Sequence, residues 1–135
     1  MTEAALSADL RVLVYVSLVT IVMWLPYILA GIGKHGLLRM VGYPAVDYAE
    51  MDPWVHRCHR AHLNLVENLA PFAALVIVAH LIGAANEATA AASWAFFWAR
   101  VVQAGGHIAG IPWVRTGAFF VSWLANVCIV WQILT

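Results

Sequence analysis

The chain has 135 residues, of which 64% are hydrophobic and only 10% charged, and its formal net charge at pH 7 is zero. A soluble domain carries about 25% charged residues, so this composition excludes a fold that covers its surface for water. The zero net charge gives no reason to expect a nucleic-acid partner. The composition therefore predicts an integral membrane protein, and the length suits one domain covering residues 1–135.

Four apolar runs follow one another along the chain, each long enough to cross a hydrocarbon core of about 30 Å. They cover residues 10–33, 58–85, 88–110 and 115–134. Pro26 lies inside the first run and predicts a kink there. Tight connections are indicated at Asn86-Glu87 and at Gly110-Ile111-Pro112, while residues 34–56 form the long loop. The pattern predicts an all-α membrane domain with four spans.

Basic residues gather on one side of this arrangement. Five of them fall in or beside the long loop or in the third connection, on the same side of the membrane: Lys34, Arg39, Arg57, Arg60 and Arg115. The other side carries one basic and three acidic residues: Arg11, Glu3, Asp9 and Glu87. The positive-inside rule then predicts a cytoplasmic long loop and places both termini on the non-cytoplasmic side.

Polar residues recur at helical spacing inside the second and third runs. The second run and its start contain Arg57, Arg60, Asn64, Glu67 and Pro71, and the third contains Arg100, Gln103 and His107. Steps of three and four residues put each set on one face of its helix. Ionisable residues at membrane depth are costly, so each is a candidate functional residue.

Glu67 and Arg100 each lie about 15 Å from the cytoplasmic ends of their helices. At the same depth they are expected to meet, since pairing lowers the cost of burying either charge. Such a pair could simply hold two helices together. The additional polar residues on both faces instead favour a polar pocket open toward the cytoplasm.

The second run contains a sequence that resembles the signature of a known family. It reads Arg57-Cys58-His59-Arg60-Ala61-His62-Leu63-Asn64-Leu65-Val66-Glu67-Asn68-Leu69-Ala70-Pro71-Phe72, with the core pattern R-A-x-x-N-x-x-E followed by P-F. This resembles the MAPEG family, the membrane-associated proteins of eicosanoid and glutathione metabolism. The resemblance continues through Phe97-Trp98-Ala99-Arg100 and Gly110-Ile111-Pro112-Trp113-Val114-Arg115-Thr116. It is weakest in the first span.

The resemblance implies a fold, an assembly and an activity. The fold is a left-handed four-helix bundle, assembled as a homotrimer with glutathione bound between neighbouring subunits near the cytoplasmic face. The activity is that of a microsomal-type glutathione transferase or peroxidase, in which the glutathione thiolate attacks a lipophilic small molecule arriving from the bilayer. The sequence looks most like the short bacterial branch, which implies the bacterial inner membrane.

The resemblance also implies roles for individual residues. Arg60 and Asn64 would hold carboxylate and backbone groups of glutathione, and Glu67 would face its ammonium. His62 would reach the site of a neighbouring subunit. Arg115 would stabilise the thiolate, with the Thr116 hydroxyl beside the sulfur. Three further residues complete the set expected to bind glutathione: Arg100, Gln103 and His107.

Two positions depart from the family pattern. Gln103 stands where characterised members often carry His or Tyr, and His107 stands where they carry Tyr. Both can form hydrogen bonds, but the aromatic wall is changed, which leaves thiol activation open. The first-helix arginine of the family has no secure match, and Lys34 and Arg39 are the candidates for its role.

Four other interpretations remain open at this point. A metal could be held by a crowded set of residues, His56, Cys58, His59 and His62, although the absence of nearby carboxylates disfavours it and no metal is expected. A haem could be held by His62 and His107. A small proton-coupled transporter would use the membrane-embedded Glu67. A non-catalytic family member, binding glutathione or acting as a scaffold, would follow from the changes at Gln103 and His107.

Overall fold

The protein, seen in a computed structural model that describes residues 5–135, is all helical within that range. The elements are α1 (Ala8–Val22), α2 (Leu25–His35), α3 (Leu37–Val41), a short 3-10 turn η1 (Tyr48–Glu50), α4 (Pro53–Leu81), α5 (Glu87–Ala109) and α6 (Pro112–Leu134). The prediction of an all-α chain is confirmed. Glu3, which contributed to the predicted orientation, lies outside the described residues.

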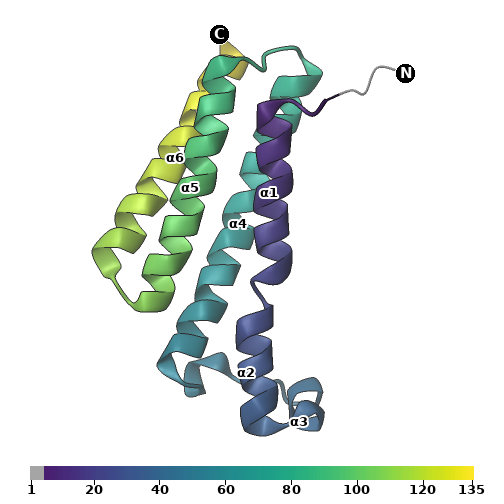
Figure 1. Cartoon of the computed structure of the whole chain (residues 1–135), viewed down its shortest axis with the longest axis vertical. Coiled ribbons are helices and arrows are strands. Elements are labelled where there is room, and N and C mark those ends of the chain that lie inside the picture. The colour runs from purple at the N-terminus through teal and green to yellow at the C-terminus, as the bar shows by residue number, and fades with distance from the viewer. Residues whose placement is uncertain (1–4) are drawn as a thin grey trace.

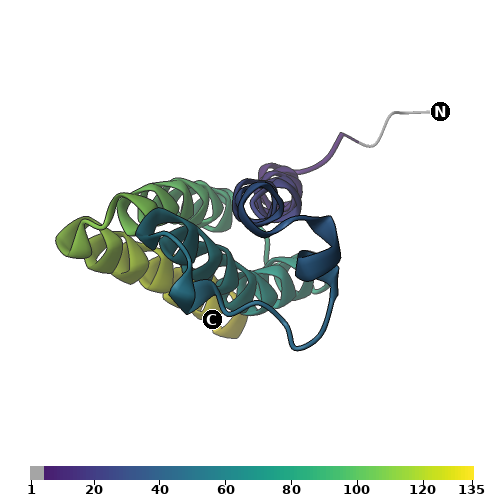
Figure 2. The same cartoon turned by 90° about the horizontal axis from the view of Figure 1, so that it is seen from below.

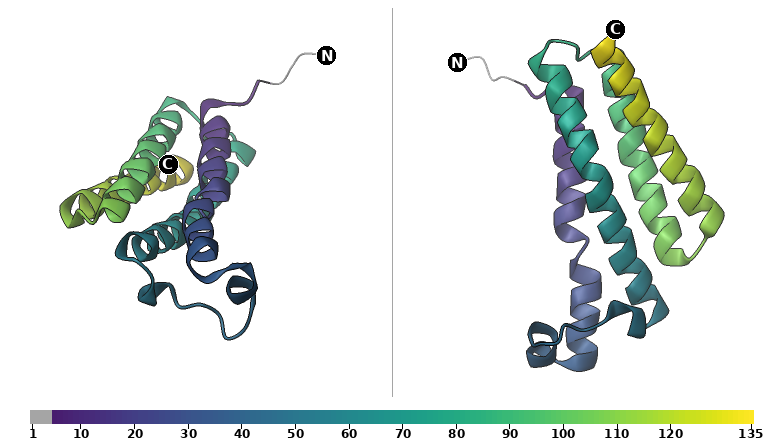
Figure 3. Two further views of the ribbon diagram at one scale, coloured as in Figure 1. Left: turned by 60° about the horizontal axis from the view of Figure 1, so that its bottom comes forward. Right: turned by 180° about the vertical axis from the view of Figure 1, so that it is seen from behind.

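The long helices run alongside one another. α1 and α2 form one column, and α4, α5 and α6 lie beside it (Figure 1). α5 and α6 make an antiparallel hairpin, and α4 packs against α1, α5 and α6 (Figure 3). The start of α1 and the end of α6 lie at one end of the molecule, and the segment between α2 and α4 lies at the other, beside the helices (Figures 1 and 2).

Three helical segments are long and apolar enough to cross a membrane: Ala8–His35, Pro53–Leu81 and Pro112–Leu134. They correspond to the first, second and fourth predicted spans. α5, the third predicted span, does not meet the same criterion, because Arg100, Gln103 and His107 lower its hydropathy. The left-handed twist of the bundle and the side of the membrane on which its termini lie stay predictions.

The kink predicted at Pro26 is confirmed as a break between two helices. α1 ends at Val22 and α2 begins at Leu25, with Pro26 in the first turn of α2. Proline has no N–H to bond the carbonyl four residues earlier, and its ring crowds that carbonyl. The column therefore changes direction here, near the middle of the first span.

The second long helix is shifted toward the N-terminus relative to its predicted span, since α4 covers Pro53–Leu81 rather than residues 58–85. α4 begins at Pro53, inside the loop expected over residues 34–56, and Pro53 occupies the first turn, where the missing N–H costs nothing. The loop also contains α3 and η1, so it is shorter and more ordered than its composition suggested. As a result, Arg57 and Arg60 lie within a regular helix rather than at its entrance.

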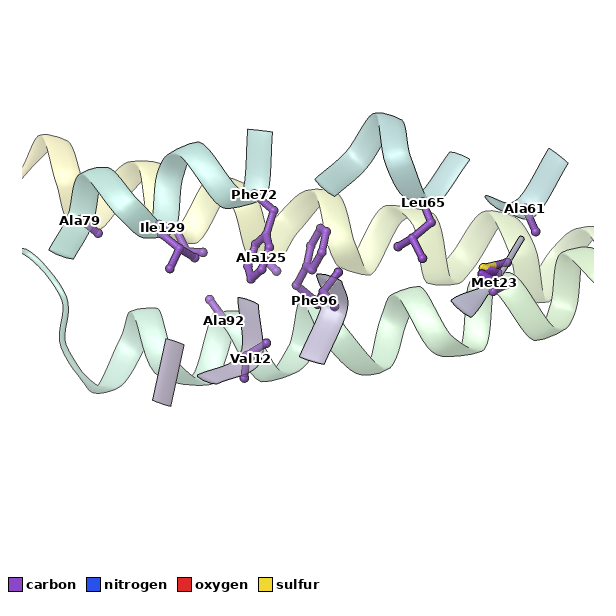
Figure 4. Packing of buried hydrophobic residues seen from close by; sticks show 13 residues of the cluster. Val12, Met23, Ala61, Leu65, Phe72, Ala79, Ala92, Phe96, Ala125 and Ile129 are labelled. Atoms are coloured by element: carbon purple, nitrogen blue, oxygen red, sulfur yellow. The ribbon is translucent and has the colours of Figure 1, made fainter. Parts of the chain in front are cut away.

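Aromatic stacking joins α4 to α5 at the centre of the molecule. The rings of Phe72 and Phe96 have centroids 4.0 Å apart and an interplanar angle of 5° (Figure 4). Both side chains are fully buried. Ala92 and Ala125 lie close to this stack, and such small side chains let helices approach closely (Figure 4). This core holds α4 and α5 side by side and sets how their polar faces meet.

A buried hydrogen bond joins α1 to α5 at the end of the molecule that lies opposite the α5–α6 turn. Asp9 is 3% exposed and accepts a hydrogen bond from the Thr89 hydroxyl at 3.1 Å. Thr89 also bonds with Asn86, whose side chain caps the start of α5. This contact fixes the start of α1 against α5.

Two glycines shape the α5–α6 turn. Gly110 ends α5 in the left-handed region, with φ +75°, which L side chains adopt rarely. A Cβ at Gly106 would lie 2.7 Å from Val114 Cγ1 and 3.2 Å from the Arg115 backbone nitrogen. Gly106 therefore lets the start of α6 lie directly against α5, and Gly110 provides the turn between the two helices.

Replacing Gly106 by alanine should push the start of α6 away from α5. Overpacking of this kind costs about 1–3 kcal/mol, so Gly106→Ala should lower the thermal unfolding temperature in detergent. Gly105→Ala is the matched control, because a Cβ there meets nothing within 4 Å in the described part of the chain. Equal unfolding temperatures for the two variants would show that the α5–α6 contact is looser than described.

Candidate functional site

A pocket of about 270 Å³ lies where α4, α5 and α6 meet. Its lining residues come from all three helices: Arg60, Asn64, Gln103, His107, Arg115, Thr116 and Phe119. Six of these seven are residues that the sequence marked as site candidates. The structure therefore brings together most of the predicted set, on the side of the molecule where α4 begins and α5 ends.

Each helix supplies residues one turn apart. On α4 these are Arg60 and Asn64, on α5 Gln103 and His107, and on α6 Arg115 and Phe119. A four-residue step returns to nearly the same face of a helix, so each pair points to one side. The hairpin turn at Gly110 then folds the face of α6 back over that of α5.

The side chains that line the pocket give it a basic character. Two guanidinium groups and one imidazole line it, and none of its described lining residues is acidic. The buried Nδ1 of His107 has no hydrogen-bond partner within residues 5–135. Arg115 also lies in the first turns of α6, where the helix dipole adds positive potential. An anionic ligand with several hydrogen-bonding groups fits this lining.

Arg100 lies behind the pocket rather than in its lining. It is 2% exposed, and its Nη1 donates to Asn64 Oδ1 at 3.1 Å. Its guanidinium carbon lies 5.6 Å from the centroid of the Phe119 ring. Its Nε and Nη2 are buried without a hydrogen-bond partner among the described residues. Arg100 thus keeps a buried positive charge, only partly satisfied, against two residues that line the pocket.

The expected Arg100–Glu67 pair is not formed. Arg100 bonds Asn64 instead, and Glu67 is exposed on the surface of the single chain. The reason is helical drift. At 3.6 residues per turn, a three-residue step falls about 60° short of a full turn. Glu67 therefore faces away from the side on which Asn64 meets α5.

His62 faces α2, on a different side of α4 from the pocket. Its Nδ1 and the Tyr27 hydroxyl lie 2.7 Å apart and share a hydrogen bond. His59 lies beside it and stacks on Tyr48, with ring centroids 4.2 Å apart. Burial raises the pKa of Tyr48, so its phenol stays protonated at neutral pH. These contacts join α4 to α2 and η1 within one chain.

The two candidates for the first-helix cation are also placed away from the pocket. Lys34 Nζ lies 3.0 Å from Asp52 Oδ1, which is the ion pair found among residues 5–135. Arg39 donates to the Pro44 carbonyl at 2.7 Å. Both residues lie at the far end of α2 or in α3, and neither lines the pocket of its own chain.

Arg57 lies next to the pocket and joins α4 to the end of α5. Its Nε donates to the carbonyl of Ile108 at 2.7 Å, which satisfies a carbonyl in the last turn of α5. A smaller adjoining cavity of about 230 Å³ is lined by Arg57, His107, Arg115 and the turn residues. Arg57 thus ties the start of α4 to the α5–α6 turn, beside the two residues that both cavities share.

Two residues that shape the pocket, Phe119 and Arg57, were not among those predicted for the site. Phe119 follows Arg115 by four residues and Thr116 by three, so helical spacing alone could have identified it. Arg57 was placed on the polar face of α4 but given no role. Its contact with Ile108 joins residues 51 positions apart, and no local sequence signal reports such a contact.

Two alternative interpretations of the histidines find no support in the geometry. No group of three or more His, Cys, Asp or Glu residues is arranged to hold a metal ion in the part of the chain that the structure describes. His62 and His107 do not face one common space, because His62 bonds Tyr27 on the α2 side while His107 lines the pocket. A shared haem would require both to turn.

The comparison with protein families identifies the chain. The model of the MAPEG family matches residues 13–135, nearly the whole length. The chain belongs to the MAPEG family, and it is an integral membrane protein of the glutathione- and eicosanoid-metabolism kind. No curated protein matches it.

Replacing Arg100 by methionine should separate a structural role from a ligand role. A buried charge with one hydrogen bond contributes little to folding, and apolar replacements of buried ionic groups are often neutral or stabilising by about 1–4 kcal/mol. Arg100→Met should therefore leave the unfolding temperature in detergent unchanged or raise it. A clear fall, with the exposed Arg11→Met variant unchanged, would show that Arg100 holds the helices together.

Proposed function

We propose that the protein is a membrane-bound, glutathione-dependent transferase or peroxidase that acts on hydrophobic electrophiles. The observation that carries the proposal is the pocket between α4, α5 and α6, which gathers Arg60, His107 and Arg115 around Asn64 and Gln103 without an acidic lining residue in the described chain. Family membership supports glutathione as the co-substrate.

The chemistry of glutathione matches this lining. The tripeptide carries two carboxylates, one ammonium and one thiol. Arg60 can bind a carboxylate with two parallel hydrogen bonds, and the amides of Asn64 and Gln103 can bond its peptide groups. Arg100, behind Asn64, adds positive potential to the inner end of the pocket. The polar peptide would then lie along α4 with its thiol toward α6.

Arg115 and Thr116 are the proposed catalytic residues. The reactive species is the thiolate, and a free thiol has a pKa of about 8.5. Bringing that pKa to about 6.5 requires about 2.7 kcal/mol of selective stabilisation of the anion. The Arg115 guanidinium and the amino end of α6 can supply it together. The Thr116 hydroxyl can donate a hydrogen bond to the same sulfur.

The thiolate then reacts with an electrophile that enters from the lipid. In conjugation, sulfur forms a bond to an electrophilic carbon, and the leaving group departs with its bonding electron pair. In peroxide reduction, the thiolate attacks one peroxide oxygen, the O–O bond breaks, and the departing alkoxide takes a proton to leave as the alcohol. A second glutathione then converts the sulfenic acid to glutathione disulfide and water. Both reactions use the same thiolate, so one pocket can serve either.

Glu67 supports the proposal that the protein works as a homotrimer. It is exposed on the single chain, about 21 Å along α4 from Pro53. A carboxylate at that depth cannot face acyl chains without a large cost. A neighbouring subunit would cover Glu67 and let it face the ammonium of glutathione bound between chains. His62, Lys34 and Arg39 do not line the pocket of their own chain, so a contact of theirs with glutathione would be at a neighbouring subunit's site.

The proposed setting is a four-span, left-handed bundle in the bacterial inner membrane, with α5 as the third span. Its polar residues are tolerated because they face α4 and α6 rather than lipid. The segment between α2 and α4 would lie in the cytoplasm, with both termini on the other side, following the distribution of basic residues.

A second candidate is a family member that binds glutathione without turnover. Gln103 favours it, because this side chain is 2% exposed and cannot act as an acid or base. Thiolate formation distinguishes the two candidates. An enzyme would ionise bound glutathione at neutral pH, whereas a carrier or scaffold would bind it as the thiol.

Replacing Arg115 by alanine should abolish thiolate formation. Wild-type protein in detergent, saturated with glutathione at pH 7, should show the ultraviolet absorbance band of a thiolate, and Arg115→Ala should lose it. Turnover with a chlorodinitrobenzene should fall by about 100-fold or more, as for the loss of one anion-stabilising donor. Arg11→Ala, at the other end of the molecule, is the matched control and should retain both.

A thiolate band that survives in Arg115→Ala would contradict the role given to Arg115. Binding of glutathione by wild type without any thiolate band would instead favour the carrier or scaffold. Absence of binding would remove the glutathione proposal for this chain.

A further inference from the structure

The segment between α2 and α4 presents large apolar side chains to its surroundings. Leu37 is 58% exposed, Leu38 87%, Val41 66% and Tyr43 96%. All four lie in or just after α3. In water such a cluster would be an unusual patch for so short a segment. In a membrane protein its meaning depends on its depth and on the charges around it.

The depth follows from the first span. The stretch of residues 12–33 carries no charged residue and is bounded by Arg11 and Lys34. At 1.5 Å per residue this stretch is about 33 Å long, close to the thickness of the hydrocarbon core. α2 ends at His35 and α3 begins at Leu37. α3 therefore starts where the hydrocarbon ends and the headgroups begin.

One side of α3 is already used for packing. Met40 is partly buried against the cluster that contains Tyr27, Met51 and Cys58. Gly31 of α2 leaves the space for it, since a Cβ there would lie 2.5 Å from Met40 Cε. The exposed residues Leu37, Leu38 and Val41 are thus left on the other sides of the helix.

Charges are divided unevenly along this segment. Near α3 lie the basic Lys34, His35 and Arg39, whereas the acidic Asp47, Glu50 and Asp52 come later, around η1. Lys34 is paired with Asp52. Arg39 uses Nη1 for the Pro44 carbonyl, and its exposed guanidinium can still meet phosphate. α3 is therefore apolar and basic, while η1 is acidic.

We propose that α3 and Tyr43 form a foot that lies in the lipid–water interface, with phospholipids of the surrounding bilayer as its partner. Leu37, Leu38 and Val41 enter the boundary between headgroups and acyl chains, and Tyr43 lies at headgroup level, where aromatic rings with a polar end are favoured. Arg39 meets lipid phosphate. The acidic η1 stays in water.

The foot has a structural consequence for α4. Because Met40 packs on the cluster with Met51 and Cys58, lipid contact on one side of α3 holds the start of α4 against α2 on the other. The Tyr27–His62 hydrogen bond lies in the same region. This inference does not depend on glutathione, so either proposal can fail without the other.

Spin labelling in lipid nanodiscs tests the foot. A nitroxide is attached at Leu38→Cys in the full chain carrying Cys128→Ala. Cys58 is 2% exposed, and the Cys128→Ala parent measures any labelling there. Ala49→Cys, in the acidic η1, is the matched control. Collision rates are measured with oxygen, which concentrates in lipid, and with a water-soluble nickel complex.

The expected result is a ratio of oxygen to nickel collisions that is several-fold higher at position 38 than at position 49, in zwitterionic and in anionic nanodiscs alike. Val41→Cys should behave as Leu38→Cys does, which guards against a local effect of one substitution. Equal ratios at 38 and 49 would place α3 in water and overturn the proposal. If the label at position 38 is immobilised and reached by neither reagent, protein such as a second copy of the chain covers α3. That outcome would also overturn the proposal.

Discussion

Polar side chains in a bilayer must face each other, and this constraint governs how the helices of this protein are arranged. α4 and α5 each carry a polar face that lipid would not tolerate. The structure turns these faces toward one another and folds α6 over them, so that Arg60, Gln103 and Arg115 line one pocket. Arg100 is buried behind this pocket, and it contacts Asn64 and Phe119 rather than a carboxylate. If the polar side chains of the helices only satisfied one another, no cavity lined by cations would remain between them. The proposed ligand, which brings negative charge, would complete the arrangement.

The pocket depends on contacts that carry no charge. The Phe72–Phe96 stack fixes the spacing of α4 and α5, and Gly106 lets the start of α6 lie against α5. Without that close approach, Arg115 could not reach the side of His107. Arg57 adds a hydrogen bond from α4 to the last turn of α5. The side chains that line the pocket are therefore positioned by Gly106, the Phe72–Phe96 stack and the hydrogen bond from Arg57 to Ile108. Substitutions at these positions outside the pocket lining are expected to affect it.

Much of this could be predicted from the sequence, and the exceptions have physical causes. The helices, the kink at Pro26 and the gathering of Arg60, Asn64, Gln103 and His107 follow from hydropathy, proline chemistry and helical spacing. The places of Arg115 and Thr116 in the site were expected from the family resemblance alone. The outward position of Glu67 was not predicted, because the shortfall of about 60° in a three-residue step decides whether a side chain enters a pocket or faces outward. The hydrogen bond between His62 and Tyr27, which are 35 residues apart, was also not predicted, and a role for His62 at a neighbouring subunit stays a prediction. Such pairings depend on how helices dock, which the local pattern does not encode.

The proposed function requires that the pocket recognises the negative charges of glutathione. The most direct measurement is calorimetric titration of the detergent-solubilised protein with glutathione and, separately, with its diethyl ester, which keeps the thiol and the ammonium but lacks both carboxylates' charges. We expect saturable binding of glutathione that is lost or greatly weakened for the ester. Equal affinity for the two compounds, or no binding of glutathione at all, would contradict it.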